Sequence, residues 1–160
     1  MNRTITTMTM LTLSVFVLGR NPAQAAEAQT TTKPATRSLY DRVGGEKAIR
    51  AVVNDFVAAA APDPKVDFTR GGTWQASDAA VLTLKDHLVA MLGNAFGGPQ
   101  KYTGRTMKVT HQGMGITTAQ FGAIAGHLKA TLEKHKVPQK EIGEIMAIAA
   151  STAPDIIEKK

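Results

Sequence analysis

The sequence predicts an all-α protein, and three observations carry this prediction. Apolar residues recur at helical spacing in successive segments after residue 37, and no segment alternates apolar and polar residues as a strand would. Capping residues, glycines and prolines stand at the expected ends of these segments. At 160 residues, of which 43% are hydrophobic, the chain is long enough for one domain with a packed core.

The first helical segment is expected soon after residue 37 and ends in a loop. Ser38 is placed to cap the first turn, and residues 49–60 then present one apolar face of a helix. That face consists of Ile49, Val52, Val53, Phe56, Val57 and Ala60. Residues 61–75 contain two prolines and two glycines, which predict a loop.

A second long helix is expected after this loop, with Ser77 as its capping residue. Its apolar positions follow the same spacing and include a histidine. They are Leu84, His87, Leu88, Met91, Leu92 and Ala95. The glycine-rich residues 97–104 end the helix.

The last third of the chain predicts one short and two longer helices. A short helical piece is expected over residues 107–111. Thr117 and Gln120 have the spacing of a capping box, so the next helix is expected to start at Thr118. Pro138 is predicted as the first residue of the final helix.

Composition excludes several classes of function. The net charge of +6 is scattered and aromatic residues make up only 5%, so nucleic acid is not expected as a partner. The chain has no cysteine, which excludes disulfides, cysteine-held zinc or iron–sulfur clusters, and haem attached through C-x-x-C-H. The zinc motif H-E-x-x-H, the hydrolase motif G-x-S-x-G and the phosphate-binding P-loop are absent from the sequence.

The N-terminus has the pattern of an export signal. Residues 1–25 combine the basic Arg3, an apolar run over residues 8–19, and the small residues Ala23 and Ala25 before a cleavage site. The run is short for a membrane-spanning helix, although an uncleaved anchor is the alternative. We expect residues 26–37 to be a flexible lead-in and residues 38–160 to form the domain. The product would be periplasmic or secreted from a bacterium, without a stable membrane anchor after cleavage.

Four histidines are the candidate metal ligands. His135, flanked by lysines near a helix end, is explained by the helix dipole, and His127 is expected to be a half-buried core residue. His87 stands in the apolar stripe, where an imidazole either finds hydrogen bonds in the core or binds a metal. His111 either caps its short helix or holds a ligand. Two histidines on separate helices among methionine, leucine and phenylalanine would suit haem, a flat apolar cofactor carrying iron.

Three segments of the domain resemble the truncated haemoglobins, in particular group I. They are residues 39–56, 95–117 and 121–138, and "MKVTHQG" in the middle segment is the most specific match. The resemblance implies a two-over-two helical sandwich around a non-covalently bound haem b, with His111 as the proximal iron ligand. It also implies that Phe68 packs on the haem face and that Tyr102 and Lys85 stand near the propionates. The remaining residues of the expected haem-binding set are Met107, Leu84, Leu88 and His87.

The distal side departs from the family pattern. Many relatives have a tyrosine where this chain has Val57, a glutamine at the position of Leu88, and a polar residue at the position of Leu84. The hydrogen-bonding cage for bound oxygen is therefore missing, which predicts weak oxygen retention. His87 matches a position at which some relatives place a second iron ligand. It is expected either to bind the iron, or to donate a hydrogen bond to bound oxygen, or to swing to the haem edge.

The resemblance implies a haem protein that binds oxygen, nitric oxide or carbon monoxide at a histidine-ligated iron. The alternative is a six-coordinate bis-histidine haem protein for electron transfer, redox buffering or nitric oxide detoxification. A nitric oxide dioxygenase or peroxidase-like activity is left open and would need an electron donor that the sequence does not identify. A helical binding module without a cofactor is the third interpretation.

Overall fold

The computed structural model describes residues 37–67, 72 and 74–159. The predicted leader, almost all of the lead-in and Phe68 lie outside this described part. All helices of the described part belong to one compact unit, Thr36–Lys160. No strand occurs among the described residues, whose isolated β-bridge joins Thr117 to Lys159. The prediction of an all-α fold is confirmed.

The helices follow one another with short connections, apart from the loops after α2 and α3. They are α1 (Leu39–Arg42), α2 (Gly45–Ala60), α3 (Asp78–Ala95), α4 (Met107–His111), α5 (Thr118–Lys134), α6 (Gln139–Ser151) and α7 (Ala153–Ile156). Within the described ranges, no helix has both the length and the hydropathy that crossing a bilayer requires.

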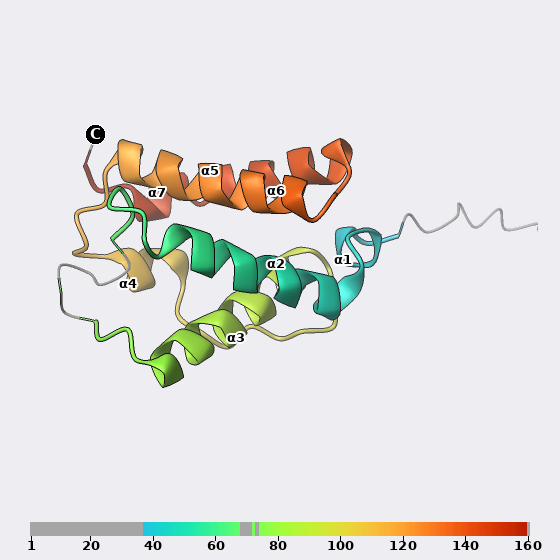
Figure 1. The fold of residues 1–160 in the computed structure, drawn as a ribbon, viewed down its shortest axis with the longest axis horizontal. Coiled ribbons are helices and arrows are strands. Elements are labelled where there is room, and N and C mark those ends of the chain that lie inside the picture. The colour runs from blue at the N-terminus through green and yellow to red at the C-terminus, as the bar shows by residue number, and fades with distance from the viewer. Residues whose placement is uncertain (1–36, 68–71, 73, 160) are drawn as a thin grey trace, which may run out of the picture. The chain divides into compact units, whose positions relative to one another are not determined.

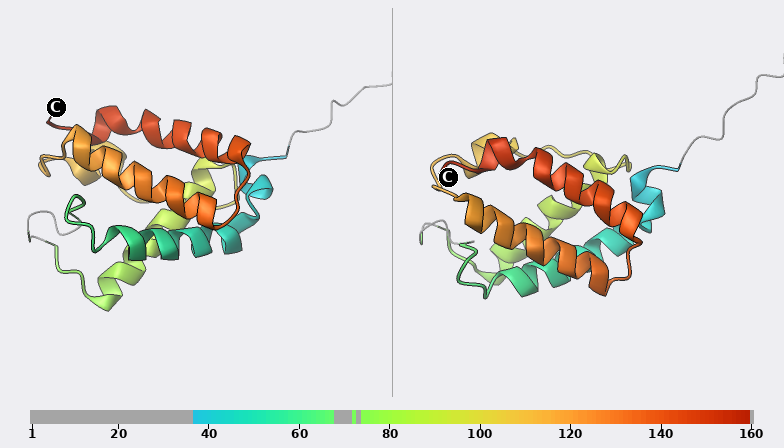
Figure 2. Two further views of the ribbon diagram at one scale, coloured as in Figure 1. Left: turned by 45° about the horizontal axis from the view of Figure 1, so that its top comes forward. Right: turned by 90° about the horizontal axis from the view of Figure 1, so that it is seen from above.

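Two pairs of long helices build the domain. Helices α2 and α3 cross in one layer, and α5 and α6 run antiparallel side by side in the other (Figures 1 and 2). Helix α2 packs against both α3 and α5 and so connects the layers. The short α4 packs against α7 at one end of the domain. This is the two-over-two sandwich that the resemblance implied.

Helix α2 supplies the largest share of the core. Ile49, Val52, Val53, Val57 and Ala60 are buried along one face, as the spacing predicted, while Phe56 is half-buried. Because α2 contacts α3 in its own layer and α5 in the other layer, burial of its apolar face stabilises the packing of both.

The prediction for α3 was right for Leu88 and Leu92, which pack half-buried against the core, but it missed the two buried residues of the helix. Val89 and Gly93 are the buried residues of α3, and His87 is exposed. A Cβ at Gly93 would lie 2.5 Å from the side-chain oxygen of Gln100, so the missing side chain allows this close packing. Two interleaved sets of positions on α3 have helical spacing, and spacing alone does not tell which set faces α2.

Capping explains where most helices begin. The Ser38 and Ser77 hydroxyls accept hydrogen bonds from the amides of Asp41 and Ala80 at 3.1 and 3.3 Å. Thr117 forms the predicted capping box before α5. Pro138, predicted as the first residue of the last long helix, is instead its N-cap, with an extended ψ of 148°. The final turn, α7, was not predicted.

Candidate functional site

His111 ends the short helix α4, and its ring is held by the backbone of the same helix. The helix begins after Thr106, whose hydroxyl accepts a hydrogen bond from the amide of Val109 at 3.3 Å. His111 Nδ1 lies 2.8 Å from the carbonyl oxygen of Met107. A carbonyl oxygen can only accept, so Nδ1 carries the proton of this hydrogen bond. In the neutral ring, Nε2 then has a free lone pair.

This arrangement fits a single-imidazole metal ligand. A backbone carbonyl that fixes the ring through Nδ1–H is a common second-sphere partner of metal-binding histidines, and it orients Nε2. His111 is half-buried, and Met107 and Met114 beside it along the chain are half-buried too. Within the described residues, no three histidine, aspartate or glutamate side chains gather into a set that could hold a metal ion. A single imidazole whose Nε2 is oriented in this way fits the protein ligand of a haem iron, to which the porphyrin would supply the other ligands.

An apolar pocket lies between the end of α2, the loop that follows it and the start of α3. It brings Val57 together with Leu84, two of the positions at which the sequence departs from the family pattern. The other lining residues are Ala61, Val66, Asp67, Trp74, Ala76 and Val81. Asp67 is the only charged residue among these lining residues, so the pocket favours apolar or weakly polar occupants.

His87 lies on α3, one turn after Leu84, and its side chain is exposed. It makes no hydrogen bond or ion pair with any residue that the structure describes. Lys85 and Leu88 next to it are half-buried. The ring nitrogens of His87 therefore make no hydrogen bond in the core. Of the two interpretations that its spacing left open, the hydrogen-bonded core histidine does not agree with this exposure.

Tyr102 shapes the loop that leads into α4. Its hydroxyl donates a hydrogen bond to the carbonyl oxygen of Arg105 at 2.9 Å. A Cβ at Gly104 would lie 2.3 Å from the same hydroxyl, so the glycine lets the chain fold closely over the ring. The expected contact of Tyr102 and Lys85 with propionates stays a prediction, and Phe68 lies outside the described residues.

Sequence reasoning missed the partner of His127. This histidine is half-buried, as expected, and its Nε2 lies 2.7 Å from a carboxylate oxygen of Asp63 in the loop after α2. The backbone amide of Lys65, followed by His127, lowers the pKa of the Asp63 carboxyl. The two residues are 64 positions apart, and no local pattern connects them.

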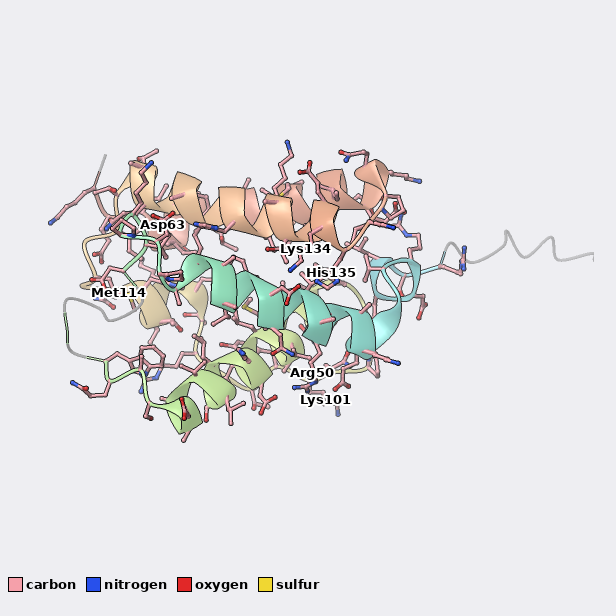
Figure 3. The ribbon with its side chains drawn as sticks, viewed as in Figure 1. Arg50, Asp63, Lys101, Met114, Lys134 and His135 are labelled. Atoms are coloured by element: carbon pink, nitrogen blue, oxygen red, sulfur yellow. The ribbon has the colours of Figure 1, made fainter. Side chains whose placement is uncertain are left out.

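His135 also has a carboxylate partner that the helix-dipole explanation did not include. Its Nε2 lies 3.0 Å from Asp55 of α2, and the Lys134 ammonium lies 2.9 Å from the same carboxylate oxygen. Figure 3 shows Lys134 and His135 beside α2. Lys134, followed by His135, lowers the pKa of the Asp55 carboxyl. These contacts join α2 to the end of α5 and lie apart from α4.

Known proteins are similar to this domain in both sequence and fold. The sequence model of the family "Bacterial-like globin" matches residues 38–158. The group 1 truncated hemoglobin GlbN of Mycolicibacterium paratuberculosis is 38% identical over 124 residues, which are 78% of this chain and 87% of that protein. The corresponding protein of Nostoc sp. is 36% identical over 118 residues, or 74% of this chain and 83% of that protein.

Solved structures agree with this relationship. The truncated hemoglobin of Tetrahymena pyriformis in its Fe(III) form superposes with a TM-score of 0.67 at 27% identity, over 76% of this chain and 98% of that one. The 2/2 hemoglobin of a Synechococcus species, in the cyanomet state with covalently attached heme, gives a TM-score of 0.61 at 31% identity, over 71% of this chain and 91% of that one.

Proposed function

This chain belongs to the bacterial-like globins as a truncated haemoglobin, and we propose that it binds haem through His111 and a diatomic gas at the haem iron. Bound haem would supply a redox-active iron with a coordination position for oxygen, nitric oxide or carbon monoxide. The family relationship supports the haem and the gas, and the geometry of this chain supports the choice of ligand residue.

One observation carries the assignment of His111. Its Nδ1 is engaged by the Met107 carbonyl, so Nε2 is the nitrogen available for iron. The two histidines with carboxylate partners, His127 and His135, have Nε2 directed at aspartates. Among the histidines, His111 therefore combines a fixed ring with an uncommitted Nε2.

We propose non-covalent attachment of the haem, as haem b. The chain has no cysteine to form a thioether bond to the porphyrin. The solved Synechococcus relative with covalently attached heme makes this a point to test directly. Acidified organic solvent should extract all haem from the purified protein, and pigment left on the chain would contradict the proposal.

We take the pocket lined by Val57 and Leu84 as the distal pocket of the proposed haem, and we propose that these two positions give a bound gas no hydrogen bond. Val57 and Leu84 offer only hydrocarbon to a ligand in the pocket that they line, and Leu88 on the same helix is half-buried. A hydrogen bond to a polar bound ligand is worth about 1 kcal/mol or more, and these side chains cannot supply it. We therefore expect oxygen to dissociate quickly and carbon monoxide to be affected less.

The decisive experiment compares His111→Ala with the matched control His135→Ala in the full chain. Absorption spectra of the purified proteins are recorded in both oxidation states, with and without carbon monoxide. The proposal predicts that His111→Ala loses most of its haem or shows a changed spectrum that added imidazole restores. His135→Ala should keep the wild-type spectrum. Unchanged pigment and spectrum in His111→Ala would refute the assignment.

His87 supports a second candidate function, that of a bis-histidine haem protein for electron transfer. Its exposed ring makes no hydrogen bond within the described residues and so is free to take another partner. Low-spin bands in both oxidation states of the wild type, lost in His87→Ala, would establish the bis-histidine ligation on which this function depends. A five-coordinate, high-spin ferrous spectrum would exclude it.

We also propose that residues 1–25 direct export. The apolar run over residues 8–19 and the small residues before position 26 support this proposal. Expression of the full-length gene in a bacterial host, followed by periplasmic release and N-terminal sequencing, tests it. A product confined to the cytoplasm with an intact Met1 would contradict it.

A further inference from the structure

The loop that follows His111 binds a carboxylate from the C-terminal end of the chain. Gly113 and Gly115 both have left-handed backbones, with φ of +82° and +63°. Their amides donate hydrogen bonds to the two carboxylate oxygens of Glu158, at 2.6 and 2.5 Å. Two backbone amides thus converge on one anion, and here the anion is a side chain of the same protein.

Backbone hydrogen bonds reinforce this contact. The amides of Glu158 and Lys159 donate to the Ile116 carbonyl at 2.9 and 3.1 Å, and the amide of Thr118 donates to the Lys159 carbonyl at 3.1 Å. We call Glu158 and Lys159 together the C-terminal clasp. The clasp contacts Gly113, Gly115, Ile116 and Thr118 along the connection from α4 to α5, and α7, which precedes it, packs against α4.

Helix α4 needs such external support. It has five residues, none of them buried, and an isolated helix of this length is unstable. Tyr102 and Thr106 secure its start through the contacts described above. Its end passes directly into the clasped loop, where the amide of Met114 donates to the His111 carbonyl at 3.1 Å.

We propose that Glu158 is a positioning residue for His111, which fixes the end of α4 and thereby the direction of the imidazole. This inference rests on the proposed function, in which His111 binds the haem iron. Glu158 does not contact His111 itself, and it acts through the amides of Gly113 and Gly115. The same two amides lower the pKa of the Glu158 carboxyl, as expected for a carboxylate held by donors.

The test uses Glu158→Gln and Glu158→Ala in the full chain, with Glu133→Gln as the control. Glutamine keeps the shape but turns an NH2 group toward one of the two amides, and alanine removes both acceptors. Glu133 is exposed on α5, where its nearest cation is Lys129 at 3.9 Å, so its change removes the same charge without touching the loop.

Three measurements separate positioning from general destabilisation. Hydrogen exchange of the Gly113 and Gly115 amides reports on the clasp with or without haem. The iron–histidine stretching frequency in the ferrous protein reports on the imidazole. The rate of haem transfer to an excess of a haem-free globin reports on retention. Outer-sphere partners typically change metal affinity by about 10–100-fold, so we expect transfer to be roughly tenfold faster in Glu158→Ala and less so in Glu158→Gln.

Faster exchange at both glycines, together with a shifted stretching frequency, supports the proposal if Glu133→Gln stays at wild type. Faster exchange with an unchanged frequency and unchanged haem transfer would overturn it, since the clasp would then be structural only. The outcome for His111→Ala is independent. If that variant kept its haem, the proposed ligand would be wrong, while intact spectra in the Glu158 variants would reject only the positioning role.

Discussion

Asp63 illustrates how one carboxylate can tie a loop to a helix in this domain. One of its oxygens accepts a hydrogen bond from the Lys65 amide at 2.9 Å, and the other lies 2.7 Å from His127 Nε2 on α5. Figure 3 shows Asp63 just beyond the end of α2. The loop that starts here supplies Val66 and Asp67 to the distal pocket. Loss of this contact is therefore expected to loosen one wall of that pocket.

The Asp63 contact should make stability depend on pH in the acid range. The pKa of its carboxyl lies below the ordinary value of 3.8, so the unfolded chain binds the proton more readily than the folded one. The resulting stability is complete well above pH 3.8 and is lost as the pH falls through the lowered folded-state value.

We predict that Asp63→Asn is less stable than wild type near pH 7 and that the difference shrinks as the pH falls below 3.8. Urea unfolding at a series of pH values measures this difference. Asp155→Asn, an exposed change in α7, is the control and should track the wild type. A difference that stays constant with pH would show that the carboxylate charge is not the cause.

At the scale of elements, capping residues made the helix starts predictable from the sequence. Which residues of a helix are buried depends on tertiary packing and was less predictable. Each capping hydroxyl accepts a hydrogen bond from the amide three residues later, so the whole contact lies in one short segment of sequence. The capping residues are Ser38, Ser77 and Thr117. Such contacts need no knowledge of the rest of the chain. The buried residues of α3 depend instead on tertiary packing, and at Gly93 the close neighbour is Gln100 in the loop after α3.

Thr117 gives the test at this scale, because its cap closes the loop held by the C-terminal clasp. Its hydroxyl accepts from the Gln120 amide at 3.2 Å, and the Gln120 side chain accepts from the Thr117 amide at 2.9 Å. Thr117→Ala removes the first of these bonds and should cost about 1 kcal/mol of unfolding free energy. Thr118→Ala, at the neighbouring exposed position, should cost less than about 0.5 kcal/mol. Urea unfolding measures both variants, and equal losses of unfolding free energy would mean that the Thr117 cap does not stabilise the helix.

At the scale of the whole molecule, the sequence indicated the candidate site better than it indicated the contacts that support it. His111, Met107 and the short helix between them are local, since the ring reaches a carbonyl four residues earlier. Glu158 lies 43 and 45 residues from the glycines that it binds, and Asp63 lies 64 residues from His127. Pairings over such distances depend on how the layers pack, and a single sequence contains no periodic signal for them.

Packing of the two layers against each other depends on α2, and a substitution of Val53 measures how much this packing stabilises the domain. It is 1% exposed, and its helix packs against both α3 and α5. Val53→Ala removes two methyl groups from this contact and leaves a cavity that neighbours on two sides cannot both fill. The transfer term of about 0.8 kcal/mol per methyl group, together with the cavity, gives an expected loss of about 2 kcal/mol.

Val109→Ala is the matched control, since the same atoms are removed from a side chain that is 54% exposed on α4. Its expected change in unfolding free energy is within about 0.5 kcal/mol. Urea unfolding of both variants, followed by circular dichroism, should give a lower midpoint with an unchanged slope for Val53→Ala alone. If both substitutions lowered the unfolding free energy by the same amount, burial of Val53 between the two layers would not be what stabilises this domain.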